Sequence, residues 1–181
     1  MSEKILEVKN LTVSFHTEDG VVHAVENVSY SVAKGKTLAI VGESGSGKSV
    51  SSLALMGLLN SSKATITGEV NFAGQDLISA DPEEVRKLRG LNIAMIFQDP
   101  LSALHPYYTI GAQLIEAVQV HHKVSEDEAR DRAKTMLERV GISSVDQRLA
   151  EYPHQLSGGM RQRVMIAMAL INNPEVLIAD E

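Results

Sequence analysis

The sequence predicts an α/β fold with an N-terminal antiparallel β-subdomain and a helical insertion. Three observations support this prediction. Segments rich in valine and β-branched residues fill the start of the chain, short apolar runs suited to buried strands recur further on, and residues 101–153 have helical composition. With 181 residues, 44% of them hydrophobic, the chain is long enough to bury a core as a single domain.

The N-terminal subdomain begins with two β-rich segments, Ile5–Phe15 and Val21–Val32. The polar stretch Thr17–Gly20 separates them and ends in Asp-Gly, a sequence typical of tight turns. We therefore expect an antiparallel hairpin. Phe15 falls at its exposed end, where the ring could stack on a base or could cover the hairpin's own core.

The apolar run Thr37–Val41 predicts a buried strand, and it leads into a glycine-rich loop with G-x-x-x-x-G-K-[ST] spacing. Glycines at three of its positions are expected to let the backbone turn with positive φ and to bring N–H groups close to an anion. Lys48 can reach the β- and γ-phosphates, and Ser49 can hold Mg²⁺. The alternative is a plain glycine-rich turn between a strand and a helix. The candidate phosphate-binding residues are Gly42, Glu43, Ser44, Gly45, Ser46, Gly47, Lys48 and Ser49.

The elements after the loop continue the alternation of helices and strands. Apolar residues from Val50 to Leu59 predict a central helix, and Ile66–Phe72 predicts another strand. Asp81-Pro82 begins a helix with an N-cap aspartate and proline at the first helical position. Leu91–Phe97 is a further buried strand that ends on Gln98, and a polar amide there can meet a metal ion or an attacking water.

Residues from Leu101 to Pro153 predict a helical insertion into the α/β core. Thr109–Val120 is helical, and Ser125-Glu126-Asp127-Glu128 is a capping box that opens another helix, which stops at Gly141. His121 and His122 have no carboxylate or cysteine at ligand spacing, so we interpret them as solvated rather than metal-binding.

A serine followed by two glycines begins the last predicted helix. Ser157 can cap that helix, and Gly158 and Gly159 would let phosphate oxygens approach its N-terminus, although an ordinary helix cap has the same sequence. The chain then enters the apolar strand Val176–Glu181, which ends in two carboxylates. Asp180 is placed to hold Mg²⁺, and Glu181 is placed to orient and deprotonate water.

Composition narrows the class of protein further. Seventeen basic and twenty-three acidic residues give a net charge of −6, which argues against a broad nucleic-acid or anionic-lipid surface. The absence of cysteine excludes disulfides and thiol catalysis within the chain. No run approaches the ~18 apolar residues of a membrane-spanning helix, and no signal-peptide core follows Met1-Ser2-Glu3-Lys4. We expect a protein of the cytoplasm.

Four of these motifs, in this order, resemble the nucleotide-binding subunit of ABC transporters, with a P-loop NTPase core of the ABC ATPase type. Gly42–Ser49 resembles the Walker A loop, Gln98 the Q-loop glutamine, Leu156–Gln162 the LSGGQ-type signature, and Val176–Glu181 the Walker B strand. Met160 replaces the glutamine of the shorthand signature, while Ser157, Gly158, Gly159 and Gln162 stay in place. Phe15 falls where the family's adenine-stacking aromatic residue lies.

The resemblance implies ATP and Mg²⁺ as cofactors, bound between two subunits packed head to tail. In that arrangement ATP on Lys48 of one copy is closed over by the Ser157 and Gly159 region of the other. Glu181, Gln98 and Lys48 would be catalytic, and Ser49, Gln98 and Asp180 would serve the metal. The expected partners are a second ATP-binding subunit, transmembrane permease subunits and, indirectly, a substrate-binding protein, at the cytoplasmic face of the inner membrane and without nucleic acid.

The resemblance also predicts an internal organisation within one nucleotide-binding domain. Residues 1–98 would form the β-subdomain and P-loop core, 99–155 the helical subdomain, and 156–181 the signature helix and Walker B strand. The family continues past Glu181 with a dimer-contact loop, a switch histidine and a C-terminal extension, so the resemblance leads us to expect that the C-terminal part of the fold is missing and that the chain is a fragment. We expect such a fragment to have little ATPase activity by itself.

Finer features point to the dipeptide and oligopeptide importer branch. They are the sequences 41–50 (VGESGSGKSV), 95–100 (MIFQDP) and 152–163 (YPHQLSGGMRQR). Related nickel importers share much of this pattern, so nickel or another small solute is an alternative cargo. A soluble ABC ATPase that remodels nucleic acid or ribosomes, or an unrelated P-loop kinase or GTPase, would be a different class. No basic face, second cassette or Asn-Lys-x-Asp guanine motif is visible in the sequence to favour either.

Overall fold

The computed structural model describes residues 3–180 and divides the chain into two compact units. The first unit extends to Arg86 and the second begins at Lys87. Each unit has its own buried apolar residues. The three-part division of the domain expected from the sequence remains a prediction.

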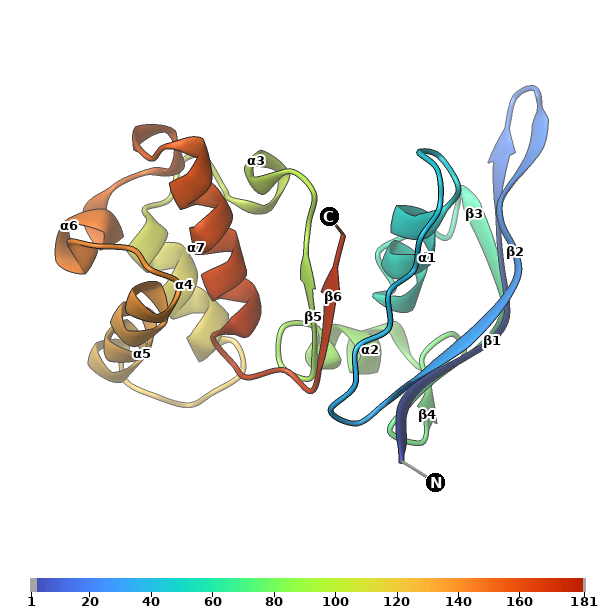
Figure 1. The fold of residues 1–181 in the computed structure, drawn as a ribbon, viewed down its shortest axis with the longest axis horizontal. Coiled ribbons are helices and arrows are strands. Elements are labelled where there is room, and N and C mark those ends of the chain that lie inside the picture. Colours follow the sequence, from blue (N-terminus) through green and yellow to red (C-terminus); the bar gives the residue numbers. More distant parts are fainter. Residues whose placement is uncertain (1–2, 181) are drawn as a thin grey trace. The chain divides into compact units, whose positions relative to one another are not determined.

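The first unit is built on a four-stranded antiparallel sheet in the order β2-β1-β3-β4 (Figure 1). Its strands are β1 (Lys4–Thr17), β2 (Gly20–Ala33), β3 (Ala64–Phe72) and β4 (Gln75–Asp76). The predicted hairpin is confirmed, because β1 pairs with β2 from Lys4↔Ala33 to Thr17↔Gly20. Register shifts interrupt this pairing, and Asn10 and Asn27 take positive φ beside them. Asparagine is one of the few residues that tolerates this conformation.

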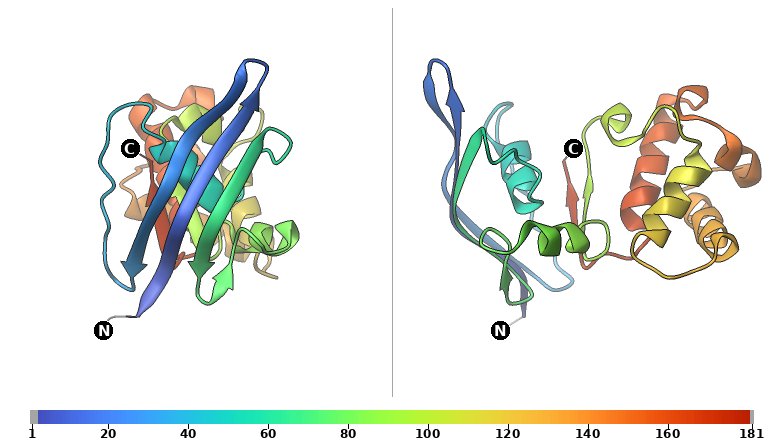
Figure 2. Two further views of the ribbon diagram at one scale, coloured as in Figure 1. Left: turned by 90° about the vertical axis from the view of Figure 1, so that its right-hand side faces the viewer. Right: turned by 180° about the vertical axis from the view of Figure 1, so that it is seen from behind.

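Helix α1 (Lys48–Leu55) lies against one face of this sheet (Figure 2). Its buried Ala54 and Leu55 belong to a core that also contains Leu11 and Val13 of β1, both fully buried. The helix is shorter than predicted, because it ends at Leu55 and the chain turns at Gly57, where φ is 60°. The predicted start of α2 (Pro82–Leu88) is confirmed, and the N–H of Glu83 donates to Asp81 Oδ1 at 2.8 Å.

The predicted strand at Thr37–Val41 is wrong for this structure. These residues form no regular element, and no strand pairs with them within residues 3–180. Leu38 is 42% exposed, Ile40 50% and Val41 94%. An apolar run becomes a buried strand only where neighbouring strands take up its backbone hydrogen bonds, and the sequence pattern alone does not supply them.

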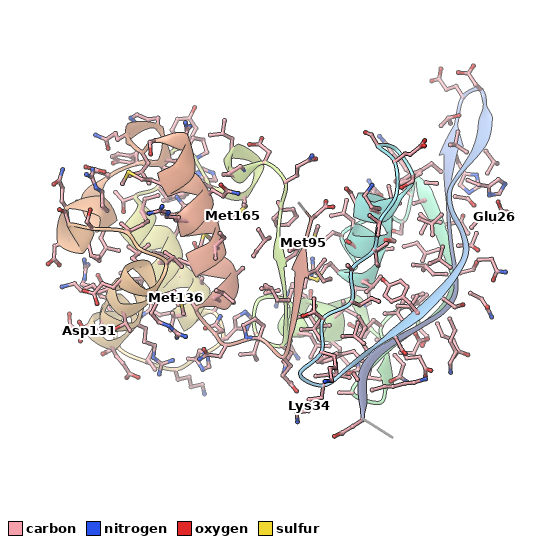
Figure 3. The ribbon with its side chains drawn as sticks, in the orientation of Figure 1. Glu26, Lys34, Met95, Asp131, Met136 and Met165 are labelled. Atoms are coloured by element: carbon pink, nitrogen blue, oxygen red, sulfur yellow. The ribbon has the colours of Figure 1, made fainter. Side chains whose placement is uncertain are left out.

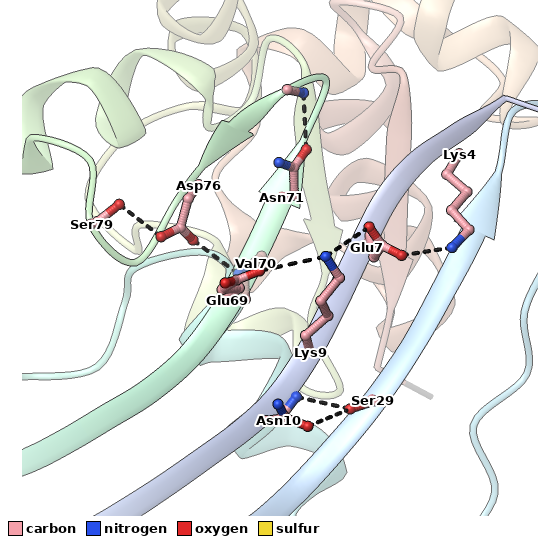
Figure 4. A network of polar contacts seen from close by, with 11 residues as sticks. Lys4, Glu7, Lys9, Asn10, Ser29, Glu69, Val70, Asn71, Asp76 and Ser79 are labelled. Carbon is pink, nitrogen blue, oxygen red and sulfur yellow. Dashed lines mark hydrogen bonds and ion pairs between the residues drawn. The ribbon is translucent and has the colours of Figure 1, made fainter.

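Polar side chains tie neighbouring strands together on the outer surface of the same sheet (Figure 4). Glu7 pairs with Lys4 at 2.6 Å and with Lys9 at 3.4 Å, and Lys9 also pairs with Glu69 of β3 at 3.5 Å. The hydrogen bond from Lys4 contributes most to lowering the pKa of the Glu7 carboxyl. Because solvent reaches these charged groups, the ion pairs contribute little to stability. Most of the stability of the sheet therefore comes from its buried apolar face.

The second unit combines a two-stranded parallel sheet with a cluster of helices (Figure 1). Its elements are β5 (Ile93–Ile96), α3 (Pro100–Ala103), α4 (Ile110–Gln119), α5 (Glu126–Arg139), α6 (Val145–Ala150), η1 (Pro153–Gln155), α7 (Gly158–Leu170) and β6 (Val176–Ala179). Leu114, Leu137 and Val164 are fully buried where α4, α5 and α7 pack together. Met136 of α5 and Met165 of α7, labelled in Figure 3, are also buried.

Side chains cap the starts of two helices of this unit, and the cap at Ser125 agrees with the prediction from sequence. Thr109 caps α4, and Ser125 caps α5 by accepting a hydrogen bond from the N–H of Glu128 at 3.2 Å. The serine half of the predicted capping box is therefore confirmed, and the Glu128 carboxylate accepts a hydrogen bond from Arg132 at 2.6 Å. Gly141, where φ is 78°, follows the C-cap of α5 as predicted. Among the described helices, none is long and apolar enough to span a membrane.

Candidate functional site

The glycine-rich loop enters α1 through two glycines in the left-handed region. Gly45 has φ 80° and Gly47, the N-cap of α1, has φ 87°. Gly42 is not among the glycines with positive φ, which corrects the expectation that all three would be. Its lack of a side chain instead leaves space for Ser46, whose Oγ would lie 2.6 Å from an added Cβ.

Gly47 also marks a close approach between the loop and the hairpin. A Cβ added at Gly47 would lie 2.2 Å from the carbonyl oxygen of Ala24 and 3.1 Å from a methyl group of Val25. Strand β2 therefore limits where the end of the loop can lie. Sequence reasoning did not identify Ala24, since its importance comes from a backbone contact that no motif marks.

Lys48 is the first residue of α1, and its side chain reaches back across the glycine-rich loop. Its Nζ donates to the carbonyl oxygens of Gly42 at 2.7 Å and Glu43 at 2.9 Å. Gly47 provides no side-chain cap, so the N–H groups at the start of α1 are not occupied by an N-cap side chain. An ammonium group, a helix N-terminus and a glycine-rich backbone combine in one segment, and this combination suits a phosphate group.

Phe15 lies near the end of the same hairpin. It is opposite Val22 of β2 and Ala64 of β3, and its side chain is half-buried. This position is compatible with stacking on a base and with covering the hairpin core, so both interpretations remain.

In the second unit, Gln98 and Asp180 follow the carboxyl ends of neighbouring parallel strands. β5 and β6 pair in register from Ile93↔Val176 to Ile96↔Ala179, and the N–H of Asp180 donates to the carbonyl of Ile96 at 3.0 Å. The structure therefore brings these two residues to the same edge of the sheet, where ligands of open α/β folds collect. Glu181 lies outside the described residues.

The Ser-Gly-Gly segment begins α7 as predicted. Ser157 Oγ accepts a hydrogen bond from the N–H of Met160 at 3.3 Å. An added Cβ at Gly158 or Gly159 would meet nothing within 4 Å, and both glycines and Gln162 are exposed. The helix N-terminus is thus open to a ligand, and its serine already has a structural role as the cap.

The features found in each of the two units define a class of protein, the P-loop nucleotide-binding α/β proteins. The first unit contains the loop, Lys48 and the N-terminus of α1, and the second contains parallel strands that end in polar residues. Comparison with known sequences identifies the family. The sequence profile described as "ABC transporter" matches residues 25–181, and the chain belongs to the ABC transporter family.

Several curated relatives are similar over almost the whole chain. "Dipeptide transport ATP-binding protein DppD" of Bacillus subtilis is 53% identical over 180 residues, covering 99% of this chain and 54% of the relative. The protein of the same name from Lactococcus lactis is 52% identical, covering 99% and 52%. "Oligopeptide transport ATP-binding protein OppD" of Bacillus subtilis is 49% identical, covering 98% and 50%. The chain therefore spans about half the length of these relatives.

Solved structures agree with the fold. The ATP-binding cassette MJ0796, as a dimer in a post-hydrolysis state with ADP and Pi, has a TM-score of 0.85 and 30% identity, covering 96% of this chain and 72% of that one. CbiO1 of Clostridium perfringens, part of the transporter complex CbiONQ, has a TM-score of 0.73 and 30% identity, covering 99% and 66%. The ABC ATPase fold expected from the sequence is confirmed.

Proposed function

We propose that this chain is the nucleotide-binding part of the ATPase subunit of a peptide importer. It would bind MgATP and, in an assembly with a second ATP-binding subunit and membrane permease subunits, hydrolyse it to drive uptake of dipeptides or oligopeptides. The relatives named for dipeptide and oligopeptide transport, at 49–53% identity, support this cargo class over nickel. The single observation that supports the proposal of ATP binding is the placement of the Lys48 ammonium group, which donates to carbonyl oxygens of the glycine-rich loop.

The phosphate-binding roles follow from the chemistry of each group. The loop backbone and Lys48 would bind the β- and γ-phosphates through charge-assisted hydrogen bonds. The hydroxyl of Ser49 and the carboxylate of Asp180 are hard oxygen donors of the kind Mg²⁺ prefers, and Gln98 adds an amide oxygen at the strand edge it shares with Asp180. When bound, Mg²⁺ would neutralise phosphate charge as the terminal bond breaks.

The remaining roles concern base stacking, water and the second copy. Phe15 would stack on adenine, and Glu181 would take a proton from the attacking water, which Gln98 helps to orient. Ser157, Gly158, Gly159 and Gln162 would approach the nucleotide of the partner copy. The open N-terminus of α7 supports this assignment, as do the dimeric MJ0796 structures. Hydrolysis would then require two chains, and the assembly would act at the cytoplasmic face of the membrane.

A nucleotide titration tests the proposal. Removal of the Lys48 ammonium in Lys48→Ala should cost about 1.5–3 kcal/mol of ATP binding, because hydrogen bonds to charged groups contribute this much. This corresponds to roughly 10- to 150-fold weaker affinity, measured by displacement of fluorescent trinitrophenyl-ATP. Lys36→Ala removes the same charge from an exposed position outside the loop and should bind as the wild type does. Equal affinity of the Lys48→Ala and wild-type proteins would contradict the proposal.

A further inference from the structure

One side-chain amide joins three segments of the second unit that lie far apart in the sequence. Asn172 follows α7, and its Nδ2 donates to the carbonyl oxygens of Gly90 at 3.0 Å and Ala117 at 2.9 Å. These partners precede Asn172 by 82 and 55 residues. The amide therefore links the end of α7 to the turn before β5 and to the last turn of α4. We call these contacts of Gly90, Ala117 and Asn172 the basal tie.

The Ala117 carbonyl takes its hydrogen bond from outside α4. The backbone N–H groups of His121 and His122, which follow the helix, both donate to the carbonyl of Val118. The last carbonyl groups of a helix need partners that the helix itself does not supply. Asn172 Nδ2 supplies one to Ala117, so the end of α4 is held by the residue that ends α7.

The two donors are the useful part of this amide. Asn172 Oδ1 is buried and has no hydrogen-bond partner among the residues that the structure describes. A buried acceptor without a partner is unfavourable, and an apolar side chain at this position would avoid that cost. An apolar side chain would also leave the Gly90 and Ala117 carbonyls without their donor. The contacts that Nδ2 makes therefore explain the amide better than packing does.

The segments joined by the basal tie lead to the candidate site residues at their other ends. β5 ends before Gln98, β6 ends before Asp180, and Ser157 is the N-cap of α7. Figure 1 shows that the chain enters β5 and β6, and leaves α4 and α7, at one side of this unit. The 13-residue α7 is about 20 Å long, so a tilt of about 10° at the tie would displace the Ser157 turn by about 3 Å.

We propose that Asn172 is a positioning residue that holds the Ser157 turn at a fixed place relative to Gln98 and Asp180, and so couples the two nucleotide sites of the assembly. This inference rests on the proposed function, in which Gln98 and Asp180 serve the chain's own ATP and the Ser157 turn serves that of the partner copy. Coupling requires an element that both sites bias. β5 and β6 pair in register, so one tie fixes α7 relative to both strands.

The first test measures the basal tie with spin labels. The sequence contains no cysteine, so cysteines introduced at the exposed Thr135 of α5 and Leu177 of β6 give a single pair of labels. α5 packs against α7 and reports its position. Asn172→Asp retains an oxygen acceptor and removes both amide donors. The label distance, measured by double electron–electron resonance, should therefore shift by more than about 2 Å or broaden, since helix shifts of this size follow repacking.

Asn173→Asp is the matched control for this measurement. Asn173 is exposed and takes positive φ, which aspartate tolerates, so this variant should give the wild-type distance. Should Asn172→Asp not fold, Asn172→Leu removes the donors together with the unpaired oxygen and tests the same tie. An unchanged distance distribution in the folded Asn172 variant would overturn the positioning role.

The second test separates ATP binding from coupling. MgATP-dependent association of two chains, followed by sedimentation velocity, should weaken at least about fivefold in Asn172→Asp, the lower end of typical coupling between sites. ATP affinity, from displacement of trinitrophenyl-ATP, should stay within about twofold of the wild type, because Lys48 and its loop belong to the first unit. Asn173→Asp should match the wild type in both measurements.

The outcomes distinguish coupling from a general loss of structure. Wild-type association in Asn172→Asp, or an equal loss of ATP affinity and association, would overturn the coupling role. The proposed function fails separately, if the wild-type chain does not bind ATP. The spin-label distance decides in either case whether Asn172 holds the basal tie.

Discussion

At the scale of single residues, backbone conformation explains where glycine is needed in the phosphate-binding motif better than side-chain chemistry does. Gly45 and Gly47 both take positive φ, but they differ in their surroundings. An added Cβ at Gly45 meets nothing within 4 Å, while one at Gly47 would overlap the carbonyl of Ala24. Gly47 is therefore required for its conformation and for its contact with β2, and the loop position depends on the hairpin.

Substitution of Gly47 tests that dependence. Gly47→Ala should destabilise the first unit by the ~1–2 kcal/mol of a left-handed alanine and by a further ~1–3 kcal/mol for the overlap with Ala24. Gly35→Ala is the matched control, because Gly35 has φ 69° and open space around it, so only the conformational part should be lost. Urea unfolding measures both. Equal losses of unfolding free energy in the two variants would mean that the contact with β2 does not limit the position of the loop.

The sequence predicted the glycine-rich loop before α1 because its motif encodes local backbone geometry, and phosphate binding by this loop stays a proposal. Spacing identified Lys48 and the glycines, yet it could not tell which glycines need positive φ and which need only space, as Gly42 shows. Asn172 was missed for a related reason. An asparagine after a helical pattern carries no signal that its amide will meet backbone carbonyls 55 and 82 residues earlier.

At the scale of elements, one serine combines a structural and a proposed functional role. Ser157 caps α7 in the same way that Ser125 caps α5. The phosphate role can be separated from capping by aspartate, which caps helices as well as serine does and repels a phosphate. The alternative of an ordinary cap, left open by the sequence, can therefore be tested directly.

Ser157→Asp should retain stability within about 0.5 kcal/mol by urea unfolding, as should Ser125→Asp, since both keep an N-cap acceptor. Only Ser157→Asp should abolish ATP-dependent association of two chains, measured by analytical ultracentrifugation with MgATP. Ser125→Asp controls for the added charge at a helix N-terminus. If Ser157→Asp chains associate with ATP as the wild type does, Ser157 is only a cap.

Asp76 of β4 shows how one carboxylate links strand β3 to the segment that follows β4 (Figure 4). Asp76 accepts from Ser79 Oγ at 2.7 Å and from the N–H of Val70 at 2.9 Å. Desolvation raises the pKa of Asp76, but hydrogen bonds from Ser79, Val70 and Ile78 together lower it below its usual value of 3.8. The ionised form is thus favoured in the folded protein.

This lowered pKa predicts a loss of stability in acid. The contribution of Asp76 is complete above the unfolded-state pKa near 3.8 and is lost as pH falls through the lower folded-state pKa. Asp76→Asn should therefore reduce stability at pH 6 and reduce it less at pH 3, as measured by urea unfolding at each pH. Asp19→Asn, in the exposed turn between β1 and β2, is the control. A pH-independent difference between Asp76→Asn and the wild type would contradict the prediction.

Elements with local signals were predictable, and elements that depend on distant partners were not. Thr109, Ser125 and Ser157 marked helix starts because an N-cap needs only the next three residues. The hairpin followed from its turn. Thr37–Val41 has the same apolar pattern as Val176–Ala179, but only the latter has a paired neighbour in residues 3–180. Strand identity is thus a property of the sheet as well as of the segment.

At the scale of the whole molecule, each unit contributes a different part of the proposed chemistry. Phe15 and the phosphate-binding loop belong to the first unit, while Gln98, Asp180 and the Ser157 turn belong to the second. Each unit also has a core of its own. Leu137 is fully buried among the helices of the second unit, and Val13 of β1 is fully buried in the first. Their stabilities can therefore differ.

Core truncation should separate the two units. Leu137→Ala should destabilise the second unit by about 2–5 kcal/mol through the cavity it leaves. Amides of α4, α5 and α7 should then exchange faster, while those of β1 and β3 keep wild-type protection, because locally cooperative units open independently. Val13→Ala is the reciprocal variant and should affect the sheet first. Faster exchange throughout both units in either variant would show instead that the chain opens as a single cooperative body.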